Sequence, residues 1–446
     1  MSFVVTGARP AMTRMAEWIG RESLVRNLGW YGLAEAVARV SRLGVTIILA
    51  RTMSSWELGL AATAITCFEL VRVLGNAGLG ELIIRASREQ LAATCETVHR
   101  LGWMLCLAMT TAQLAVGGGL ALFGGGAELV AMTLCLAGVF LVMPCGLVPA
   151  YLLRRDARLR EVALIGCAQA VADSVLTVVL ALSGAGAWAI VLPKLLTAPL
   201  WLLAVRRCRV WTRGSARDAL PIREVVPFAL PILGSEILSA ARLQLDKIIV
   251  AALLGVEALG CYFFAFNAGI GLSLVLTTAL AGSLFPELAR QAADRDELLR
   301  CFDRAVRTTV IPIAGLLALQ AVAAFVYVPL IFGERWGQAA PLVSLLCLSA
   351  VGKPYFDASL QLARAAGLPA ADLKASMALA AINLAVLAAA LALGVGLTAA
   401  VAAFALACLV TQLAGGILVR RHVGSEFPGS HGLLATPSAR SSQRPQ

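Results

Sequence analysis

The sequence predicts an all-α integral membrane protein with twelve transmembrane helices in two six-helix lobes and both termini in the cytoplasm. Three observations lead to this fold class. The 446 residues are 59% hydrophobic and only 14% charged, with a mean hydropathy of +0.83, which is far from the composition of a soluble domain. The chain divides into apolar stretches of about 20 residues, the length that crosses a bilayer. Its Lys and Arg residues gather in alternate joints between those stretches, as the positive-inside rule requires.

The joints set the expected orientation of the spans. The spans lie near residues 28–50, 58–80, 101–123, 127–153, 162–183, 187–205, 227–254, 259–285, 309–332, 338–362, 375–393 and 397–419. With the N-terminus in the cytoplasm, only Arg51 and Arg335 fall in joints on the outer side. The net charge of +11 therefore reflects topology. Nucleic-acid binding is not expected, because no soluble segment interleaves basic and aromatic residues.

The spans and joints define five expected segments. Residues 1–27 form a cytoplasmic N-terminal segment without the pattern of a cleavable signal peptide, so the first span is the expected targeting signal. The N-lobe, with helices 1–6, covers 28–205, and a basic cytoplasmic connector covers 206–226. The C-lobe, with helices 7–12, covers 227–419. The tail 420–446 is polar and rich in Pro and Ser, which is typical of cytoplasmic disordered segments.

The two expected lobes repeat each other in sequence. Glu35 aligns with Glu236 at an offset of 201 residues, and "SREQLAATCETVHR" (87–100) aligns with "DRDELLRCFDRAVR" (294–307) at an offset of 207. Each lobe is expected to have six spans, and an even number returns the chain to the side on which it started. Both lobes therefore have the same orientation in the membrane, and the repeat is parallel. The two aligned joints are expected to form short amphipathic helices, with Leu298, Leu299 and Phe302 on one side. Such a helix either lies on the membrane surface or is a solvated, charge-paired helix.

Features of an enzyme are not found in the sequence. The outer joints, such as "GGG", "GAGA" and "GVG", are too short for an outer catalytic domain. The eleven Cys form no C-x-x-C pair and the three His lie far apart, so no metal site or cofactor is predicted. No Walker loop or nucleophile elbow occurs. The sequence therefore predicts a protein that is not an enzyme.

The first span carries charges near its middle. Glu35, Arg39 and Arg42 fall within roughly 60° of one another on a helix of 100° per residue. A charge at the centre of a spanning helix costs about 2.5 to 3.5 kcal/mol when it faces lipid. This face of the helix is therefore expected to look into the protein.

Other spans carry charges as well, and together they predict a polar path. Asp173 and Lys194 lie in spans five and six, and structural ion pairs, such as Arg242 with Asp246 at i, i+4, are the alternative explanation. Ionisable residues inside a membrane are functional by default, so a water-filled cationic cavity between the two lobes is predicted. Its expected substrate-binding cations are Arg39, Arg42, Arg72, Arg242, Lys247 and Lys353. The acids expected to serve ion coupling or charge balance are Glu35, Glu69, Glu236, Asp246 and Asp357.

Three stretches of the sequence carry a family resemblance. The segment "SRLGVTIILARTMSSWELGLAA" holds an Arg followed by the turn AR-x-(L/M)-x-x-x-E-x-G, at Arg42, Ala50, Arg51, Met53, Glu57 and Gly59. The segment "LDKIIVAALLGVEALGCYFFAFN" holds D-(K/R) followed by G-x-x-x-L-G-x-Y, at Asp246, Lys247, Gly255, Leu259, Gly260 and Tyr262. A third, "FGERWGQAAPLVSLLCLSAVGKPYFDASLQLARAAG", follows in order. These patterns resemble the Wzx-type polysaccharide exporters, or flippases, of the MOP superfamily.

The resemblance implies a function, a substrate and a location. It implies a MOP/MATE-like fold and a flippase that moves an undecaprenyl-pyrophosphate-linked oligosaccharide across the bacterial inner membrane, for O-antigen, capsule or exopolysaccharide assembly. Membrane lipids, and further a polysaccharide polymerase and chain-length machinery, are the implied partners. The alternatives are a multidrug or lipid II exporter of the same superfamily, and a membrane enzyme of polysaccharide assembly. A major-facilitator transporter is disfavoured because the loop after span two, "GELIIRASREQLAATCETVHR", lacks that family's motif.

Overall fold

A computed structural model describes residues 32, 34, 36–214, 221–292 and 294–425. Glu35 and most of the two predicted cytoplasmic tails lie outside the described residues. All regular elements in the described ranges are helical, as the composition predicts. The chain divides into two compact units, Met1–Gln244 and Leu245–Gln446, and the division falls inside one long helix, α9.

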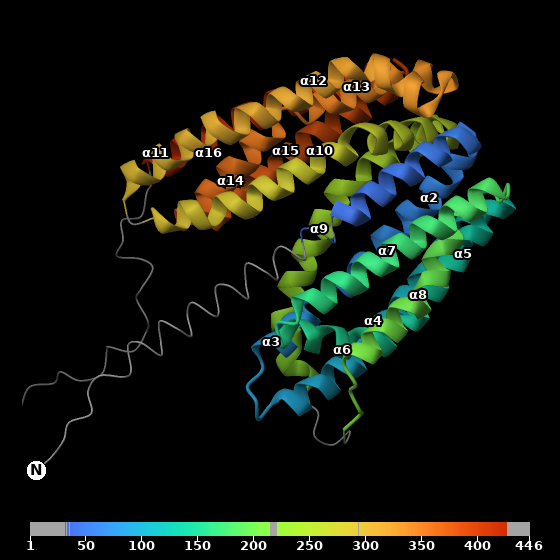
Figure 1. Cartoon of the computed structure of the whole chain (residues 1–446), viewed down its shortest axis with the longest axis vertical. Helices are drawn as coiled ribbons and strands as arrows, with labels where there is room; N and C mark the ends of the chain where they lie inside the picture. The colour runs from blue at the N-terminus through green and yellow to red at the C-terminus, as the bar shows by residue number, and fades with distance from the viewer. Residues whose placement is uncertain (1–31, 33, 35, 215–220, 293, 426–446) are drawn as a thin grey trace, which may run out of the picture. The chain divides into compact units, whose positions relative to one another are not determined.

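The first unit consists of helices that pack in neighbouring pairs. α4 packs on α5, α5 on α8 and α7 on α8, so these four run side by side (Figure 1). Its elements are the helix over residues 36–52, α2 (Ser55–Arg72), η1 (Val73–Gly75), α3 (Leu79–Arg85), α4 (Leu91–Leu122), α5 (Ala127–Val142), α6 (Pro144–Arg155), α7 (Leu159–Leu182), α8 (Trp188–Cys208) and the part of α9 (Ile222–Leu254) that ends at Gln244.

Two local signals in the first unit explain where its helices begin and bend. α2 begins with a capping box, in which the Ser54 hydroxyl accepts from the Glu57 backbone N–H and the Glu57 carboxylate accepts from the Ser54 backbone N–H. This arrangement satisfies two backbone donors that the helix leaves open. α5 and α6 meet at a bend of 55°. Pro144 begins α6 there, since proline cannot continue the hydrogen-bond ladder of the preceding helix.

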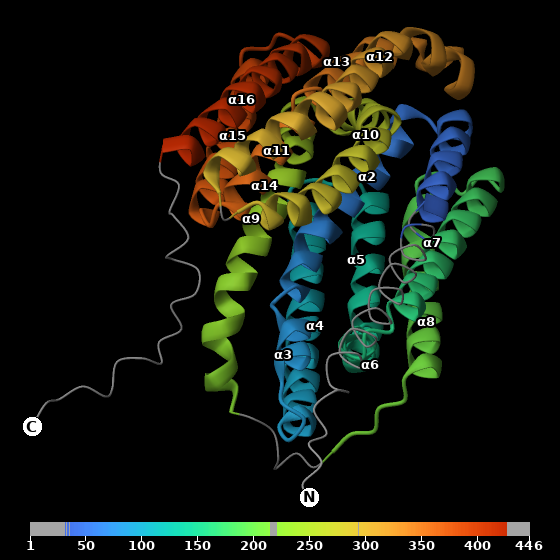
Figure 2. The ribbon, with the colours of Figure 1, turned by 60° about the vertical axis from the view of Figure 1, so that its left-hand side comes forward.

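The second unit has a similar set of helices. α15 packs on α16, α12 on α13, and α14 on both α10 and α16 (Figure 2). Its elements are α10 (Val256–Arg290), α11 (Arg295–Ala305), the π-helix η3 (Val306–Val310), α12 (Ile311–Tyr327), the π-helix η4 (Val328–Phe332), the 3-10 helix η5 (Glu334–Ala339), α13 (Ala340–Ser349), α14 (Lys353–Ala365), α15 (Pro369–Ala392) and α16 (Leu397–Ser425).

Many of these helices are long and apolar enough to cross a membrane. Within the described residues eight such spans are found, or nine when the bent pair α5 and α6 is counted as one more. The chain is therefore a multi-pass membrane protein. The other three expected spans are helical over their described residues, as the helix 36–52, α9 and α10. The twelve-span arrangement and the cytoplasmic location of both termini stay predictions.

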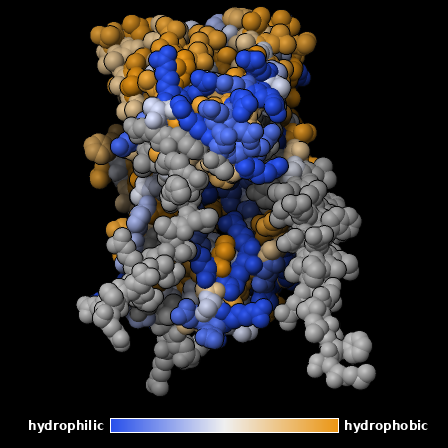
Figure 3. Space-filling view, turned by 90° about the vertical axis from the view of Figure 1, so that its left-hand side faces the viewer, coloured by the Kyte–Doolittle hydropathy of each residue, from blue (hydrophilic) through white to orange (hydrophobic). Residues whose placement is uncertain are grey.

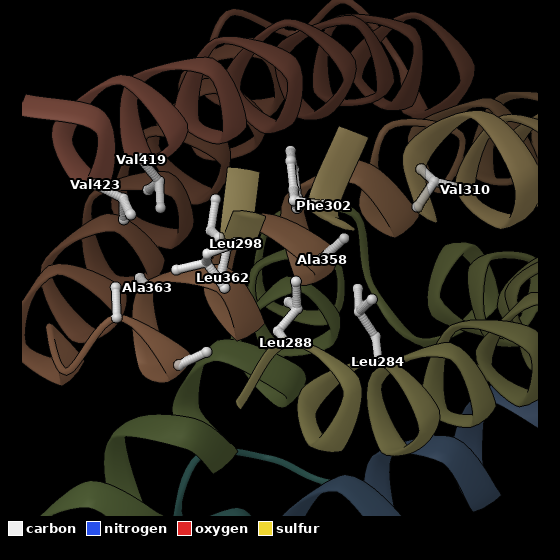
Figure 4. Close-up of a cluster of buried hydrophobic side chains, with 12 residues drawn as sticks. Leu284, Leu288, Leu298, Phe302, Val310, Ala358, Leu362, Ala363, Val419 and Val423 are labelled. Carbon is white, nitrogen blue, oxygen red and sulfur yellow. The ribbon is translucent and has the colours of Figure 1, made fainter. Parts of the chain in front are cut away.

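The predicted amphipathic helix after α10 exists, and its apolar face packs on its own unit. α11 buries Leu298 and Phe302 completely. They lie in a cluster with side chains of α10, α14 and α16, among them Leu288, Leu362 and Val419 (Figure 4). These apolar side chains therefore fasten α11 to its own unit, and the position of the helix at the membrane surface stays a prediction. Hydrophilic residues gather over this end of the unit, beside a hydrophobic flank (Figure 3).

The two units share turn geometry at an offset of 210 residues. In the turn between α6 and α7, the N–H groups of residues 156, 157 and 158 bond to the carbonyls of residues 152, 154 and 153. The turn between α14 and α15 repeats all three bonds at residues 366, 367 and 368. Ala157 and Gly367, at the matching position, have φ angles of 52° and 78°. α7 and α15 each have 24 residues.

An ion pair also recurs in the two units. Nε of Arg213 lies 3.2 Å from Oε1 of Glu96 in the first unit. Nη2 of Arg420 lies 2.7 Å from Oδ2 of Asp303 in the second. Both pairs join residues 117 apart in sequence, and Glu96 aligns with Asp303 in the repeated joints. The recurrence indicates that this contact holds the two ends of each unit together.

Candidate functional site

The first unit contains a cavity of about 500 Å³. Its walls come from the helix 36–52 and from α2, η1, α5, α6, α7 and α8. A second cavity, of about 280 Å³, shares part of this lining, and residues common to both include Arg42, Arg154, Gln169 and Trp201. The two cavities therefore adjoin each other, and both lie within the first unit alone.

The larger cavity has an excess of positive charge. Its charged lining residues are the cations Arg42, Arg72, Arg154 and Lys194 and the carboxylates Glu69 and Asp173. The four cations come from four different helices, so their positions depend on the packing of the unit and not on one helix face. A site with two more cations than carboxylates has a positive potential, which attracts anions.

Two ion pairs organise the charges of the cavity. Nη2 and Nε of Arg72 lie 2.6 and 2.9 Å from Oε2 of Glu69, one helical turn earlier in α2. Nζ of Lys194 in α8 lies 2.7 Å from Oδ2 of Asp173 in α7. Such pairs lower the cost of keeping charges inside a membrane protein when no ligand is bound. Oδ1 of Asp173 is buried and accepts no hydrogen bond from the described residues.

Three of the predicted site residues line this cavity, and two more lie near it. Arg42, Arg72 and Glu69 are part of the lining. Arg39 is half-buried on the same helix as Arg42. Glu236 of α9 accepts a hydrogen bond of 3.0 Å from Nδ2 of Asn76, and Asn76 lines the cavity.

The predicted charges at the start of the second unit form a closed cluster. Asp246 and Lys247 are 7% and 6% exposed, and Nζ of Lys247 lies 3.3 Å from Oδ1 of Asp246. The Tyr262 hydroxyl donates to Oδ2 of Asp246 over 2.8 Å, and Nζ of Lys247 lies 4.3 Å from the centre of the Phe266 ring. Burial of a charged pair requires such partners.

The remaining predicted residues pair within a helix or are not described. Nζ of Lys353 lies 2.8 Å from Oδ2 of Asp357, one turn later in α14. Glu35 and the side chain of Arg242 lie outside the described residues. In the described part of the chain, no group of His, Cys, Asp and Glu has the arrangement of a metal site.

Sequence reasoning missed several residues of the cavity. Arg154 follows the expected span 127–153 directly, so it was assigned to a joint. The search for charged residues inside spans could not find Trp201, Gln169 or Tyr151, because none of them is charged. A signal was present for Asp173 and Lys194, which are charges inside expected spans, but they were not included in the predicted site.

The sequence matches known proteins over most of its length. Residues 48–341 match a family model described as "Polysaccharide biosynthesis protein". The succinoglycan biosynthesis transport protein ExoT of Rhizobium meliloti (strain 1021) is 26% identical over 75% of this chain and 68% of its own. The lipopolysaccharide biosynthesis protein WzxC of Escherichia coli (strain K12) is 24% identical over 75% of this chain and 69% of its own.

Solved structures with a similar fold are transporters of the MOP superfamily. The lipid II flippase MurJ in its inward closed conformation superposes with a TM-score of 0.68 at 14% identity, over 89% of this chain and 87% of that one. An inward-facing MATE family multidrug transporter has a TM-score of 0.63 at 16% identity, over 86% and 94%. At these identities the likeness concerns the fold. Since the family model covers well over half of the sequence, this chain belongs to the polysaccharide biosynthesis protein family, in agreement with the predicted resemblance to Wzx-type exporters of the MOP superfamily.

Proposed function

We propose that this protein is a flippase that moves an undecaprenyl-pyrophosphate-linked oligosaccharide from the cytoplasmic to the periplasmic leaflet of the bacterial inner membrane. The observation that carries the proposal is the cationic cavity of the first unit, in a chain whose family and relatives belong to polysaccharide biosynthesis. O-antigen, capsule or exopolysaccharide is the product to which the transported unit contributes. A polymerase and chain-length machinery are the partners that take up this unit.

The charges of the cavity suit a diphosphate. Arg42, Arg72 and Arg154 present planar guanidinium groups, which hold phosphate oxygens in a bidentate way, and Lys194 adds a point charge. The pairs Arg72–Glu69 and Lys194–Asp173 keep two of these cations compensated while the cavity is empty. A diphosphate competes with the carboxylates for the same cations, so binding and loss of the pairs are coupled.

Transport further requires that the cavity opens to each side in turn. We infer alternating access of two six-helix lobes, with Arg39, Arg242, Lys247 and Lys353 joining Arg42 and Arg72 as substrate-binding cations along the path. The acids Glu35, Glu69, Glu236, Asp246 and Asp357 serve ion coupling or charge balance in this proposal. The coupling role is supported if the rate of flipping in proteoliposomes changes when a proton or sodium gradient is imposed. It is contradicted if neither gradient changes that rate.

Removal of single positive charges tests the cationic path. We expect Arg39→Ala, Arg42→Ala and Arg242→Ala each to abolish polysaccharide export while the protein still inserts, because the diphosphate then lacks a counter-charge. The measurement is surface polysaccharide in a deletion strain that carries each variant, with membrane levels of the protein checked by immunoblot. Arg207→Ala, at an exposed position in the last turn of α8 and outside the lining of both cavities, is the matched control and should export normally. Normal surface polysaccharide in all three test variants would contradict the proposal.

Deletion of the gene separates this function from that of a drug exporter. If the protein flips lipid-linked oligosaccharide, the deletion strain accumulates that glycolipid on the cytoplasmic side and loses the corresponding surface polymer. A multidrug exporter would instead leave the polymer intact and change the sensitivity of the cells to toxic compounds. A lipid II exporter would affect cell-wall assembly.

A further inference from the structure

Two aromatic side chains lie among the charges of the cavity. Trp201 of α8 lines both adjoining cavities, and Tyr151 of α6 lines the larger one. Both side chains are half-buried. The carboxamide residues Gln169 and Asn76 are also part of the lining of the larger cavity. Carboxamide groups can donate to phosphate oxygens as well as to sugar hydroxyls, but an aromatic ring offers a diphosphate no hydrogen bond or counter-charge, so the rings have a different role from the cations.

Each ring rests on a glycine that no other residue can replace without a shift. A Cβ atom at Gly146 of α6 would lie 2.5 Å from Cζ3 of Trp201, and a Cβ at Gly80 of α3 would lie 2.8 Å from Cδ1 of Tyr151. Both distances are far below van der Waals contact. The two glycines therefore seat the rings against neighbouring helices and fix their positions before any ligand binds.

The second unit shows that the fold does not require these residues. Counting without a gap from the shared turns, at an offset of 210, the second unit has different side chains at several of the positions in and beside the cavity, whereas Arg364 matches Arg154. There Thr411 donates a hydrogen bond of 3.1 Å to Asn383, so the positions that match Trp201 and Asp173 are joined to each other. The matching residues are Phe356 for Gly146, Leu379 for Gln169, Asn383 for Asp173, Phe404 for Lys194 and Thr411 for Trp201. The matching helices α14 and α16 instead pack through the reverse contact, with the rings of Phe356 and Tyr355 of α14 against Gly415 and Gly416 of α16. Packing of this helix pair thus does not require a Trp on the second helix, which leaves the placement of Trp201 at the cavity to be explained by a ligand.

We propose that Trp201 is the platform of a sugar-binding subsite in the first unit, seated by Gly146 and accompanied by the Gln169 carboxamide. A pyranose ring has an apolar face of C–H groups, which packs on an aromatic ring, and a rim of hydroxyls, which bond to amides. The ligand class is the oligosaccharide of the transported glycolipid, whereas the cations hold its diphosphate. This inference rests on the proposed function and adds which wall of the cavity recognises the glycan.

The test compares two lipid probes on the purified full-length protein. One probe is undecaprenyl diphosphate without sugars, and the other is the lipid-linked oligosaccharide extracted from cells that lack the gene. We expect Trp201→Leu to weaken binding of the glycolipid about tenfold and to leave undecaprenyl diphosphate unchanged. Trp201→Phe, which keeps an aromatic face, should bind the glycolipid within about threefold of the wild type. Gly146→Ala, which displaces the ring, should act like Trp201→Leu.

A matched control and the probe comparison separate the outcomes. Trp56→Leu removes a Trp that is 53% exposed on the outside of the unit, and it should change neither affinity. Equal weakening of both probes by Trp201→Leu would indicate a structural role and overturn the subsite, as would unchanged binding of both. If the wild-type protein binds neither probe, the proposed function itself fails.

Discussion

At the scale of single residues, Ala157 adopts a backbone conformation that usually requires glycine. Its φ of 52° lies in the left-handed region, and the matching residue of the second unit is Gly367, with φ 78°. The hydrogen bonds of the two turns correspond one to one. The turn therefore demands this conformation, and only the second unit meets the demand with a residue that adopts it without strain.

This mismatch predicts a stabilising substitution. Ala157→Gly should raise the free energy of unfolding by about 0.5 to 1 kcal/mol. It removes the clash of Cβ with the backbone, and this gain is larger than the cost of the greater conformational entropy of glycine in the unfolded chain. Gly367→Ala is the matched reverse change and should destabilise by about 1 kcal/mol. Thermal unfolding of both variants in the same detergent measures the two effects. A lower melting temperature for Ala157→Gly would contradict this reading of the turn.

At the scale of elements, α11 shows how a polar, amphipathic segment becomes part of a membrane domain. Phe302 and Leu298 fill a cluster between α10, α14 and α16, while the Asp294 side chain caps the start of the helix by accepting from the backbone N–H groups of residues 296 and 297. The charged face of the helix stays exposed. Core packing therefore holds the segment on its unit.

Truncation of Phe302 tests that packing. Phe302→Ala removes a fully buried ring and should lower the free energy of unfolding by about 3 to 5 kcal/mol, as buried aromatic truncations do. Phe325→Ala in α12, where the ring is 56% exposed, is the control and should cost little. The melting temperatures in detergent report both changes. If α11 instead rested on the membrane, Phe302→Ala would leave the melting temperature in detergent near that of the wild type and weaken only lipid contacts.

At the scale of the whole molecule, the predicted topology has a direct test. A green fluorescent protein fused after residue 446 should fluoresce, and alkaline phosphatase at the same point should be inactive, because the positive-inside rule places the C-terminus in the cytoplasm. Fusions in the expected outer joint at 184–186 should show the reverse. Active phosphatase at the C-terminus would contradict the cytoplasmic location of that terminus.

Much of the fold was readable from the sequence, since apolar length and charge position determine spans. The expected spans are mostly helical over their described residues, although 127–153 is divided into α5 and α6 and 338–362 into α13 and α14. Arg42, Arg72 and Glu69, placed on inward faces by the helical period, line a cavity of the first unit, whereas the predicted cavity between the lobes stays a prediction. Features that depend on the packing of the helices could not be predicted from the sequence. The 55° bend at Pro144 directs α6, and with it Arg154, along the cavity, and no sequence pattern gives such an angle.

Neutral residues of the site were hidden for a different reason. Trp201 lies in a spanning helix, where the sequence does not distinguish it from a tryptophan that faces lipid. Its contact with Gly146 and its place in the cavity lining are seen only in the structure. Likewise, adjacent residues do not normally share a helix face, so the pairing of Asp246 with its neighbour Lys247 was not predicted. The tyrosine that completes this cluster comes from the next helix.

The segment after α8 has a consequence for handling the protein. Arg209 and Arg213 attach it to Asp156 and Glu96 through ion pairs of 3.4 and 3.2 Å, and the Arg213 side chain is 61% exposed. Exposed ion pairs weaken as salt rises, whereas buried ones are screened much less, and the Glu96 side chain is only 2% exposed. Trp211 of the same segment also packs on the buried cluster that includes Ile83 and Val148. Residues 209–213 are therefore expected to stay attached in a concentrated salt buffer, so that trypsin cuts at Arg209 and Arg213 equally slowly at low and at high ionic strength.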